Sequence, residues 1–460
     1  MRGSMEAEDF ASFLASYNEE PCKSLRINPL KKHSAGVPAP DCKTLFGLEP
    51  VEWCENGFYY DGSTLPGKHP LHEAGAFYIQ EASAMAPVKW LDVRPGMRVL
   101  DLCAAPGGKS TEIAELLQNT GFLVANEPDR NRAKILSLNI ERLGIRNAFV
   151  SNEMPDKLAE LFPGFFDRIL VDAPCSGEGM FRKNPEAVKE WSEENVSMCA
   201  MRQDGILESA AKMLVPGGIM VYSTCTFSKE EDEGSIERFL NREKDFCLIS
   251  PDSIRNIPDG FVRADIPNGS SGYGIRLFPH KIRGEGHFFA VLKRDGFSPE
   301  GGIRSAASGL LKEASQSAKK LFSDFVWEFI SVENGIISGK SILHEFGDQL
   351  YLADSMMPGI KGLKVLRPGL HLGTLKNKRF EPGHALALFL SPDDAALQAH
   401  IPDAETALRY LKGESLSADY LTNADGRGWC IMEFMGMSLG WGKSDGRMLK
   451  NHYPKGLRKN

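Results

Sequence analysis

Short apolar runs alternate with amphipathic segments from about residue 86 to residue 295. Runs rich in Val, Ile and Leu are typical of buried strands, and apolar residues spaced three and four apart are typical of helices that pack on them. Strands that alternate with helices predict an α/β fold with a mainly parallel sheet. The predicted strands are 98–103, 122–126, 148–152, 168–172, 219–224 and 287–293, and the predicted helices are 110–118, 129–143 and 201–214.

The segments on either side of this core have different patterns. The first part predicts a small α+β unit, with helical spacing at 10–17 and a strand at 24–28. A stretch rich in Gly and Ser at 296–309 predicts a linker, which a helix follows. The remainder is rich in strand patterns and turn residues, with one helical stretch near 402–412. The expected units are therefore 5–85, 86–295, 296–324, 325–400 and 401–460.

Composition limits the classes of protein that fit. The chain has 460 residues, a formal net charge of −7 and nine cysteines. This charge argues against nonspecific coating of nucleic acid but leaves room for a local basic surface. No apolar run reaches the ~18 residues of a membrane span, so we expect a cytoplasmic protein without a membrane partner. The cysteines form no C-x-x-C pair, so neither a structural zinc nor any other metal is expected.

Reactive side chains follow the predicted parallel strands where each strand ends. Ligands of open α/β sheets bind in the crevice beyond the carboxyl ends of the strands. The sequence therefore predicts one site at this edge of the sheet. In strand order it would receive Cys103, Glu127, Asn152, Asp172 with Cys175, and Cys225.

The turn after the first strand, 103–109, reads CAAPGGK. A Walker loop would need glycine where Cys103 stands, and the dinucleotide pattern G-x-G-x-x-G is absent. Two glycines before a helix allow a carboxylate to approach the backbone, and Glu127 could accept bonds from ribose hydroxyls. Together they favour an adenosine ligand without pyrophosphate, which S-adenosylmethionine fits. The alternatives are a tight turn that binds nothing and a solvated glutamate.

The two cysteines at neighbouring strand ends suggest covalent catalysis. Carbon-5 of cytosine is a poor nucleophile until a thiolate adds to carbon-6 and makes the ring an enamine. Such chemistry needs a cysteine held at the ligand rim and a group that relieves charge on ring N3. Cys225 and Cys175 supply thiols, and Asp172 supplies a carboxyl group. The alternative is two inert buried cysteines beside an aspartate that caps a helix.

Three motifs resemble those of the Sun-type RNA cytosine-5 methyltransferases: LDLCAAPGGKS at 100–110, VDAPCSGEGMFRK at 171–183 and YSTCTF at 222–227. The ending SLGWGKSDGRMLKNHYPKGLR at 438–458 resembles the bacterial RsmF-like branch, which modifies 16S ribosomal RNA. The opening at 9–31 and the segment 75–85 fit the same branch, so the resemblance spans nearly the whole chain.

The resemblance implies a Rossmann-like core that uses S-adenosylmethionine, a small N-terminal RNA-binding unit and PUA-like C-terminal modules. It implies that Cys225 is the nucleophile, that Cys175 assists release and that Asp172 lies between cofactor and cytosine, and Lys109 is placed with these catalytic groups. Position 152 usually holds Asp near the adenine, and here it is Asn152. The expected cofactor residues are Cys103, Ala104, Ala105, Pro106, Gly107, Gly108, Lys109, Glu127, Arg132, Asn152 and Asp172.

The expected partner is ribosomal RNA, as free 16S RNA or in a small-subunit particle, bound by a monomer. Candidate phosphate contacts are Arg182, Lys183, Lys450, Lys455 and Arg458. Each could instead be an ordinary solvated charge, since exposed Lys and Arg are common. Two other functions stay open. One is a nucleic-acid methyltransferase that acts on an exocyclic nitrogen, with both cysteines structural, and the other is a non-catalytic RNA-binding assembly factor.

Overall fold

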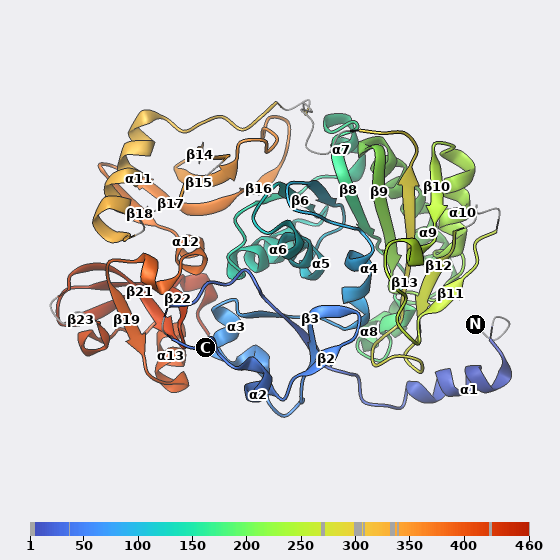
Figure 1. The fold of residues 1–460 in the computed structure, drawn as a ribbon, viewed down its shortest axis with the longest axis horizontal. Helices are drawn as coiled ribbons and strands as arrows, with labels where there is room; N and C mark the ends of the chain where they lie inside the picture. Colours follow the sequence, from blue (N-terminus) through green and yellow to red (C-terminus); the bar gives the residue numbers. More distant parts are fainter. Residues whose placement is uncertain are drawn as a thin grey trace.

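The computed structural model describes residues 5–35, 37–267, 272–298, 306, 309–331, 336–337, 340–422 and 426–459. Most of the linker predicted at 296–309 lies outside these residues. Figure 1 places the N-terminal sheet below the central α/β core and the C-terminal sheets to one side of it. No helix among the described residues has the length and apolarity needed to cross a bilayer.

The core is a ten-stranded sheet whose main order is β11-β12-β13-β9-β8-β5-β6-β7-β16. The five central strands from β9 to β7 pair in parallel, and β13 continues the sheet antiparallel to β9. This confirms the predicted Rossmann-like α/β class. The bounds are β5 Arg98–Asp101, β6 Phe122–Asn126, β7 Ala148–Ser151, β8 Phe166–Asp172, β9 Leu214–Thr224, β10 Phe246–Ile249, β11 Val262–Ala264, β12 Gly274–Leu277 and β13 His287–Arg294.

Helices cover both faces of this sheet. Apolar side chains of α4, α5 and α6 share one buried cluster with residues of the sheet, and those of α7, α9 and α10 share another. Helix α9 begins well before the predicted start at 201, because the Ser192 hydroxyl accepts a hydrogen bond from Asn195 N and caps the first turn. The bounds are α4 Ala86–Lys89, α5 Gly108–Leu117, α6 Arg130–Arg142, α7 Pro155–Leu161, α8 Pro185–Glu190, α9 Glu193–Met213 and α10 Glu233–Arg242.

The N-terminal part forms a four-stranded sheet in the order β2-β3-β1-β4. The strand predicted at 24–28 is present as β1 Ser24–Ile27. Helix α1, Ala7–Ser16, lies apart from this sheet against the core, where the Phe13 ring meets Phe227 edge-on at 5.2 Å. The other bounds are α2 Cys42–Phe46, β2 Glu49–Val51, β3 Cys54–Tyr59, α3 Pro70–Glu73 and β4 Phe77–Ile79.

The C-terminal part contains two further sheets, in the orders β14-β15-β17-β18 and β19-β21-β22-β23-β20. One strand from this part, β16 Val365–Pro368, leaves them and pairs antiparallel with β7 at the edge of the core sheet. The other bounds are α11 Gln316–Phe329, β14 Ser341–Phe346, β15 Gln349–Asp354, β17 Leu370–Lys376, β18 Arg379–Pro382, α12 His384–Phe389, β19 Gln398–Ile401, α13 Ala404–Leu411, β20 Leu416–Ser417, β21 Gly428–Phe434, β22 Met437–Ser444 and β23 Met448–Asn451.

Candidate active site

A cavity of about 440 Å³ lies at the carboxyl ends of β5, β6, β8 and β9. Four parallel strands therefore deliver their following residues to one place, the crevice in which open α/β sheets bind ligands. Residues 103, 127, 172, 175 and 225, which are far apart in the sequence, all line it. The complete lining is Cys103, Ala105, Glu127, Pro128, Asp129, Arg132, Met154, Pro155, Asp172, Ala173, Pro174, Cys175, Arg202, Ile206 and Cys225.

The turn between β5 and α5 brings main chain close to this cavity. Gly107 has φ of 117°, a conformation that L side chains rarely adopt, and an added Cβ would lie 3.2 Å from Leu136 Cδ1. Gly108 begins α5, so the helix N-terminus faces the strand ends, where its dipole favours an anionic group. A ligand carboxylate such as that of a methionine moiety fits this electrostatic setting.

Glu127, after β6, is an acidic residue in the lining of the same cavity. Its side chain is buried, and its Oε1 accepts a 3.0 Å hydrogen bond from Asp129 N. Within the described chain, Oε2 has no hydrogen-bond partner, and its nearest cation is Arg132 Nη1 at 3.5 Å. Arg132 lies 3.5 Å from the carboxylate and donates to Ala105 O at 2.9 Å, which ties α6 to the turn. A carboxylate oxygen without a donor suits a ligand that brings hydroxyl groups, as a ribose does.

Asn152 lies beside this group but not in the cavity lining. Its Nδ2 donates to Glu127 O at 2.8 Å and to Pro128 O at 2.7 Å, so its amide holds the loop that carries Glu127. Asn152 N donates to Lys364 O at 2.9 Å, from the residue just before β16. Met154, just before α7, and Pro155, its first residue, do line the cavity. An apolar wall there suits a flat base.

Asp172 ends β8 and carries an organised set of partners. Lys109 Nζ donates to its Oδ2 at 2.9 Å, and Ser223 Oγ donates to its Oδ1 at 2.8 Å. Burial raises the pKa of Asp172, but the charge of Lys109 and these hydrogen bonds outweigh burial, so the pKa is lowered overall. Burial lowers the pKa of Lys109, but the charges of Asp172 and Cys225 raise it by more, so the pKa of Lys109 is raised overall. The pair is therefore an ionised carboxylate and an ammonium group.

The sulfur atoms of Cys175 and Cys225 lie 3.4 Å apart and are free thiols. Their hydrogen bond and burial raise the pKa of Cys175 well above the usual value, so Cys175 keeps its proton and acts as the donor. The positive charge of Lys109 acts on Cys225, since Cys225 is among the groups that raise the pKa of Lys109. Lys109 therefore places a positive charge close to the Cys225 sulfur.

A buried polar network fixes the loops that carry both cysteines. Gln203 Nε2 on α9 donates to Pro174 O at 3.0 Å and to Glu231 at 2.8 Å, and Glu231 accepts from Ser176 N at 3.0 Å. Gly179 N donates to Cys225 O at 2.9 Å. An added Cβ at Gly179 would lie 2.5 Å from Gly286 O, so only glycine allows these loops to approach so closely.

The five predicted RNA contacts lie in different environments. Arg182 is buried, where its guanidinium pairs with Glu285 at 2.9 Å and donates to Ser16 O at 3.1 Å. It therefore fastens α1 to the loop that follows Cys175. Lys183, Lys450 and Lys455 are exposed, and Arg458 is half-buried. Lys450 lies 3.4 Å from Asp445.

Two groups near the cavity were absent from the predicted set. Arg202 lines the cavity from α9, and within the predicted helix 201–214 no local pattern distinguishes it from an ordinary helix arginine. His287 begins β13 and lies 3.9 Å from Asp172 through its Nε2. Its sequence context, HFFAVLK, predicts only a buried strand. No cluster of three or more potential metal ligands occurs in the part of the chain that the structure describes.

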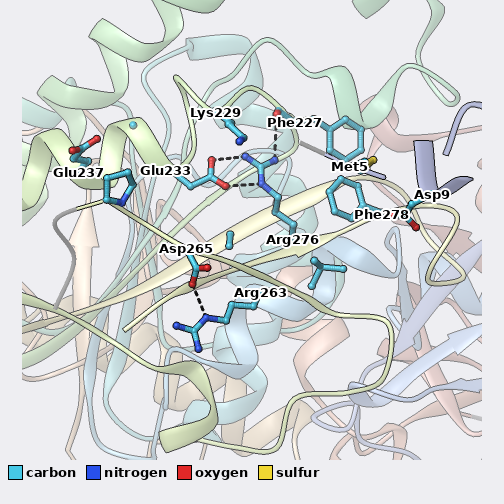
Figure 2. Close-up of a pocket in the computed structure, with 14 residues that line it drawn as sticks. Met5, Asp9, Phe227, Lys229, Glu233, Glu237, Arg263, Asp265, Arg276 and Phe278 are labelled. Atoms are coloured by element: carbon cyan, nitrogen blue, oxygen red, sulfur yellow. Dashed lines mark hydrogen bonds and ion pairs between the residues drawn. The ribbon is translucent and has the colours of Figure 1, made fainter. Parts of the chain in front are cut away.

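A second cavity of about 430 Å³ lies between α1, β11 and the loop after Cys225, and Figure 2 shows its lining. Four of its charged groups form pairs: Arg276 makes paired hydrogen bonds with Glu233, and Arg263 pairs with Asp265. Its lining includes none of the residues predicted to bind cofactor or to take part in catalysis. The strand-end cavity is therefore the better candidate for the chemistry.

Four family profiles match consecutive parts of the chain. Residues 88–293 match 16S rRNA methyltransferase RsmB/F, and residues 1–82 match the N-terminal domain of 16S rRNA methyltransferase RsmF. Residues 330–390 match the first C-terminal domain of RsmF rRNA methyltransferase, and residues 398–459 match the RsmF PUA domain. The predicted PUA-like C-terminal module is thereby confirmed.

Solved structures of the same fold include a methyltransferase homolog from Pyrococcus horikoshii, with a TM-score of 0.50 and 29% identity over 62% of this chain and 90% of the homolog. NSun6 from Pyrococcus horikoshii, solved with SFG, has a TM-score of 0.53 and 22% identity over 63% of this chain and 95% of its own, a likeness of fold alone.

Full-length relatives extend the match. Ribosomal RNA small subunit methyltransferase F of Vibrio cholerae is 32% identical over 453 residues, which is 97% of this chain and 93% of the relative. The protein of that name from Aeromonas hydrophila is 33% identical over 459 residues, again 97% of this chain and 93% of the relative. The chain therefore belongs to the RsmF branch of the RsmB/F family of S-adenosylmethionine-dependent 16S rRNA methyltransferases.

Proposed function

We propose that this protein methylates carbon-5 of a cytosine in 16S ribosomal RNA through a covalent bond between Cys225 and carbon-6 of the base. The observation that carries the proposal is the pair of thiols 3.4 Å apart at the rim that also holds Asp172 and Lys109. An exocyclic amino group would need no such thiol, because its own lone pair attacks the methyl donor. Two adjacent cysteines at the ligand rim therefore favour the ring carbon as the acceptor.

S-adenosylmethionine supplies an electrophilic methyl group on its sulfonium centre when bound. The residues that fit it are the turn 103–109 for the carboxylate end, Glu127 for the ribose and the Met154–Pro155 wall for the adenine. Oε2 of Glu127 is the specific match, since it has only a 3.5 Å ion pair with Arg132 and ribose hydroxyls would supply the hydrogen-bond donor that it lacks. Arg132 and Asn152 support this site by holding the Ala105 and Glu127 main chain.

The protein side of the reaction follows from the positions of the charges. The Cys225 thiolate adds to carbon-6, and the electron pair of the ring double bond moves toward carbon-5 while negative charge grows on the N3 side. The Lys109 ammonium stabilises that charge, and the Asp172 carboxylate accepts from the exocyclic amino group. Carbon-5 then forms the bond to the methyl group, while the bond between that methyl group and the sulfonium sulfur breaks and leaves its electron pair on the sulfur.

Release requires two further events. The proton on carbon-5 passes to a base at the rim, and the carbon-6–sulfur bond breaks as the ring double bond returns. Cys175 lies next to the departing sulfur and holds its own proton, so its S–H can stabilise the Cys225 thiolate as it leaves. This gives the two cysteines different tasks, attack for Cys225 and release for Cys175.

We further propose that a cytoplasmic monomer acts on free 16S RNA or on a small-subunit particle. The target base must be unstacked to reach a cavity at the strand ends, at a cost of a few kcal/mol, which favours loops or locally melted RNA. The exposed lysines Lys183, Lys450 and Lys455 are the better candidates for phosphate contacts, because the Arg182 guanidinium is already buried against Glu285.

The identity of the methylated nucleoside tests the proposal. Unmodified 16S RNA is incubated with the protein and labelled cofactor, digested to nucleosides and analysed by mass spectrometry. We expect 5-methylcytidine as the labelled product. Label in N4-methylcytidine would establish the exocyclic-nitrogen alternative. Absence of label from both free RNA and small-subunit particles would support the non-catalytic alternative.

A further inference from the structure

His287 lies directly behind the proposed catalytic carboxylate. It begins β13, which pairs antiparallel with β9, and this register sets Phe288 opposite Thr224, just before Cys225 in the chain. The imidazole is 2% exposed, and its Nε2 is 3.9 Å from Asp172 Oδ1, beyond normal hydrogen-bond length. Neither Nδ1 nor Nε2 has a hydrogen-bond partner in the described part of the protein.

An imidazole in this position has an unused donor. Burial and the charge of Lys109 lower the pKa of His287 to about 3, so the ring is neutral at neutral pH and carries one N–H group. A buried N–H without an acceptor costs free energy, and most such groups in native proteins are paired. The closest charged acceptor is Asp172, whose two oxygens are already engaged by Lys109 and Ser223.

Binding of cytosine would change this balance. Lys109 is the only donor that bonds to Oδ2 of Asp172 among the described side chains, and it is also the cation that the proposed mechanism places against ring N3. If Lys109 turns toward the base, the buried Asp172 carboxylate loses part of the positive charge and hydrogen bonding that offset its burial. His287 Nε2, about one ångström beyond bonding distance from Oδ1, could then donate to that oxygen alongside Ser223 and restore part of the stabilisation of the carboxylate.

We propose that His287 is a positioning residue for Asp172, whose imidazole N–H donates to the Asp172 carboxylate when a bound cytosine draws Lys109 toward its ring. This rests on the proposed cytosine chemistry. The other titratable groups near Asp172 are Lys109 on α5, Asp101 at the end of β5 and Cys103 in the turn after β5. Cys225, after β9, interacts with Lys109, which in turn pairs with Asp172.

The proposal has a consequence for the pH dependence of the reaction. A hydrogen bond donated to a carboxylate favours its ionised form, so loss of the donor raises the pKa of that carboxylate in the complex. As the pH is lowered, the rate of methyl transfer should therefore begin to fall at a higher pH in a variant that lacks this donor than in the wild type. If His287 only fills space behind Asp172, its replacement should not shift the acidic limb, which is the low-pH side of the pH–rate profile.

The experiment compares His287→Leu, which removes the donor, with His287→Gln, which restores one. The rate of 5-methylcytidine formation is measured from pH 5 to pH 9 at saturating cofactor and RNA. The control is His344→Leu, which removes a buried histidine on β14, outside the core sheet. Thermal melting and cofactor titration for every variant separate losses of folding or cofactor binding from the effect on Asp172.

We expect His287→Leu to bind cofactor as the wild type does and to lose about 10- to 100-fold in kcat, the range for one hydrogen bond to a charged group. Its acidic limb should move upward by about one pH unit, and His287→Gln should recover most of both effects. Equal impairment of the Leu and Gln variants, or a Leu variant with the wild-type limb, would overturn the proposal.

A second measurement needs no loss of the side chain, should His287→Leu fail to fold. In protein labelled with nitrogen-15 histidine, we expect the His287 ring signal to change when 5-fluorocytidine RNA is trapped, as Nε2–H enters a hydrogen bond. An unchanged signal in the trapped complex would overturn the proposal. If wild-type protein instead forms no 5-methylcytidine and traps no RNA, the proposed function has failed, which is a separate result from failure of His287 alone.

Discussion

Arg26 of the N-terminal sheet donates a 2.9 Å hydrogen bond to the main-chain carbonyl of Gly108 in the core. The same guanidinium donates to Thr111 at 2.6 Å and pairs with Glu115, both on α5. Arg26 and Glu112, 3.9 Å apart, are both fully buried. A side chain outside the core therefore ties the N-terminal sheet to the turn that we expect to hold the cofactor carboxylate.

Arg26→Ala should destabilise the whole protein. It leaves Glu115 buried without its cation, whereas Glu112 keeps its 3.2 Å ion pair with Lys89. Breaking a buried ion pair in this way costs about 3–5 kcal/mol. We expect the free energy of unfolding, measured by urea titration, to fall by about that amount. Arg409→Ala is the control, because its ion pair with Glu414 is half-exposed and exposed ion pairs contribute little to stability. Equal losses in the two variants would contradict a structural role for the Arg26 network.

Glu127→Gln should weaken cofactor binding while the fold is kept. Glutamine retains one acceptor oxygen but loses the charge, and a hydrogen bond to a charged group is worth about 1.5–3 kcal/mol. We therefore expect calorimetric titration to give a Kd for S-adenosylmethionine that is about 10- to 100-fold higher. Glu160→Gln, at an exposed position on α7, serves as the control. An unchanged Kd for Glu127→Gln would remove Glu127 from the cofactor site.

The buried carboxyl group of Asp101 should make the free energy of unfolding depend on pH. Burial raises its pKa to about 7, above the ordinary value of 3.8, although Ser110 Oγ donates to it at 2.6 Å. The folded state therefore binds this proton more tightly than the unfolded chain between about pH 4 and pH 7. In that window the free energy of unfolding falls as pH rises, by up to about 1.4 kcal/mol per pH unit.

Asp101→Asn removes this titration and keeps a similar shape. We expect the variant to gain stability relative to the wild type as the pH is raised from 5 to 7. Urea titration at pH 5 and at pH 7 gives the difference in the free energy of unfolding between the variant and the wild type at each pH. A difference in the free energy of unfolding that stays constant between these pH values would show that Asp101 does not hold its proton in the folded state.

The parallel core could be predicted from the sequence because its determinants are local. Buried strands such as 122–126 and 168–172 are apolar runs bounded by turn residues, and their ends carry the reactive side chains. The arrangement of strands then follows from the general behaviour of α/β sheets. The same reasoning was enough to predict that five residues converge on one cavity: Cys103, Glu127, Asp172, Cys175 and Cys225.

Long-range contacts could not be predicted in the same way. Strand β16 pairs with β7 across more than 200 positions, and no local pattern distinguishes it from strands of its own C-terminal sheets. Asn152 was expected near the adenine, yet its amide hydrogen bonds hold main chain, and these depend on where β16 places Lys364. His287 is a polar residue in an apolar run, and its proximity to Asp172 appears only once β13 is paired with β9.

The most direct measurement uses Cys225→Ala and Cys175→Ala, with Cys247→Ala on β10 as the control, incubated with 16S RNA and S-adenosylmethionine and separated on a denaturing gel. Cys175→Ala should accumulate a covalent protein–RNA complex, because attack proceeds and release is slowed, and peptide mass spectrometry should place the RNA on Cys225. Cys225→Ala should form no complex, even with RNA that contains 5-fluorocytidine. A complex formed by Cys225→Ala, or RNA attached to Cys175, would contradict the assignment of Cys225 as the nucleophile.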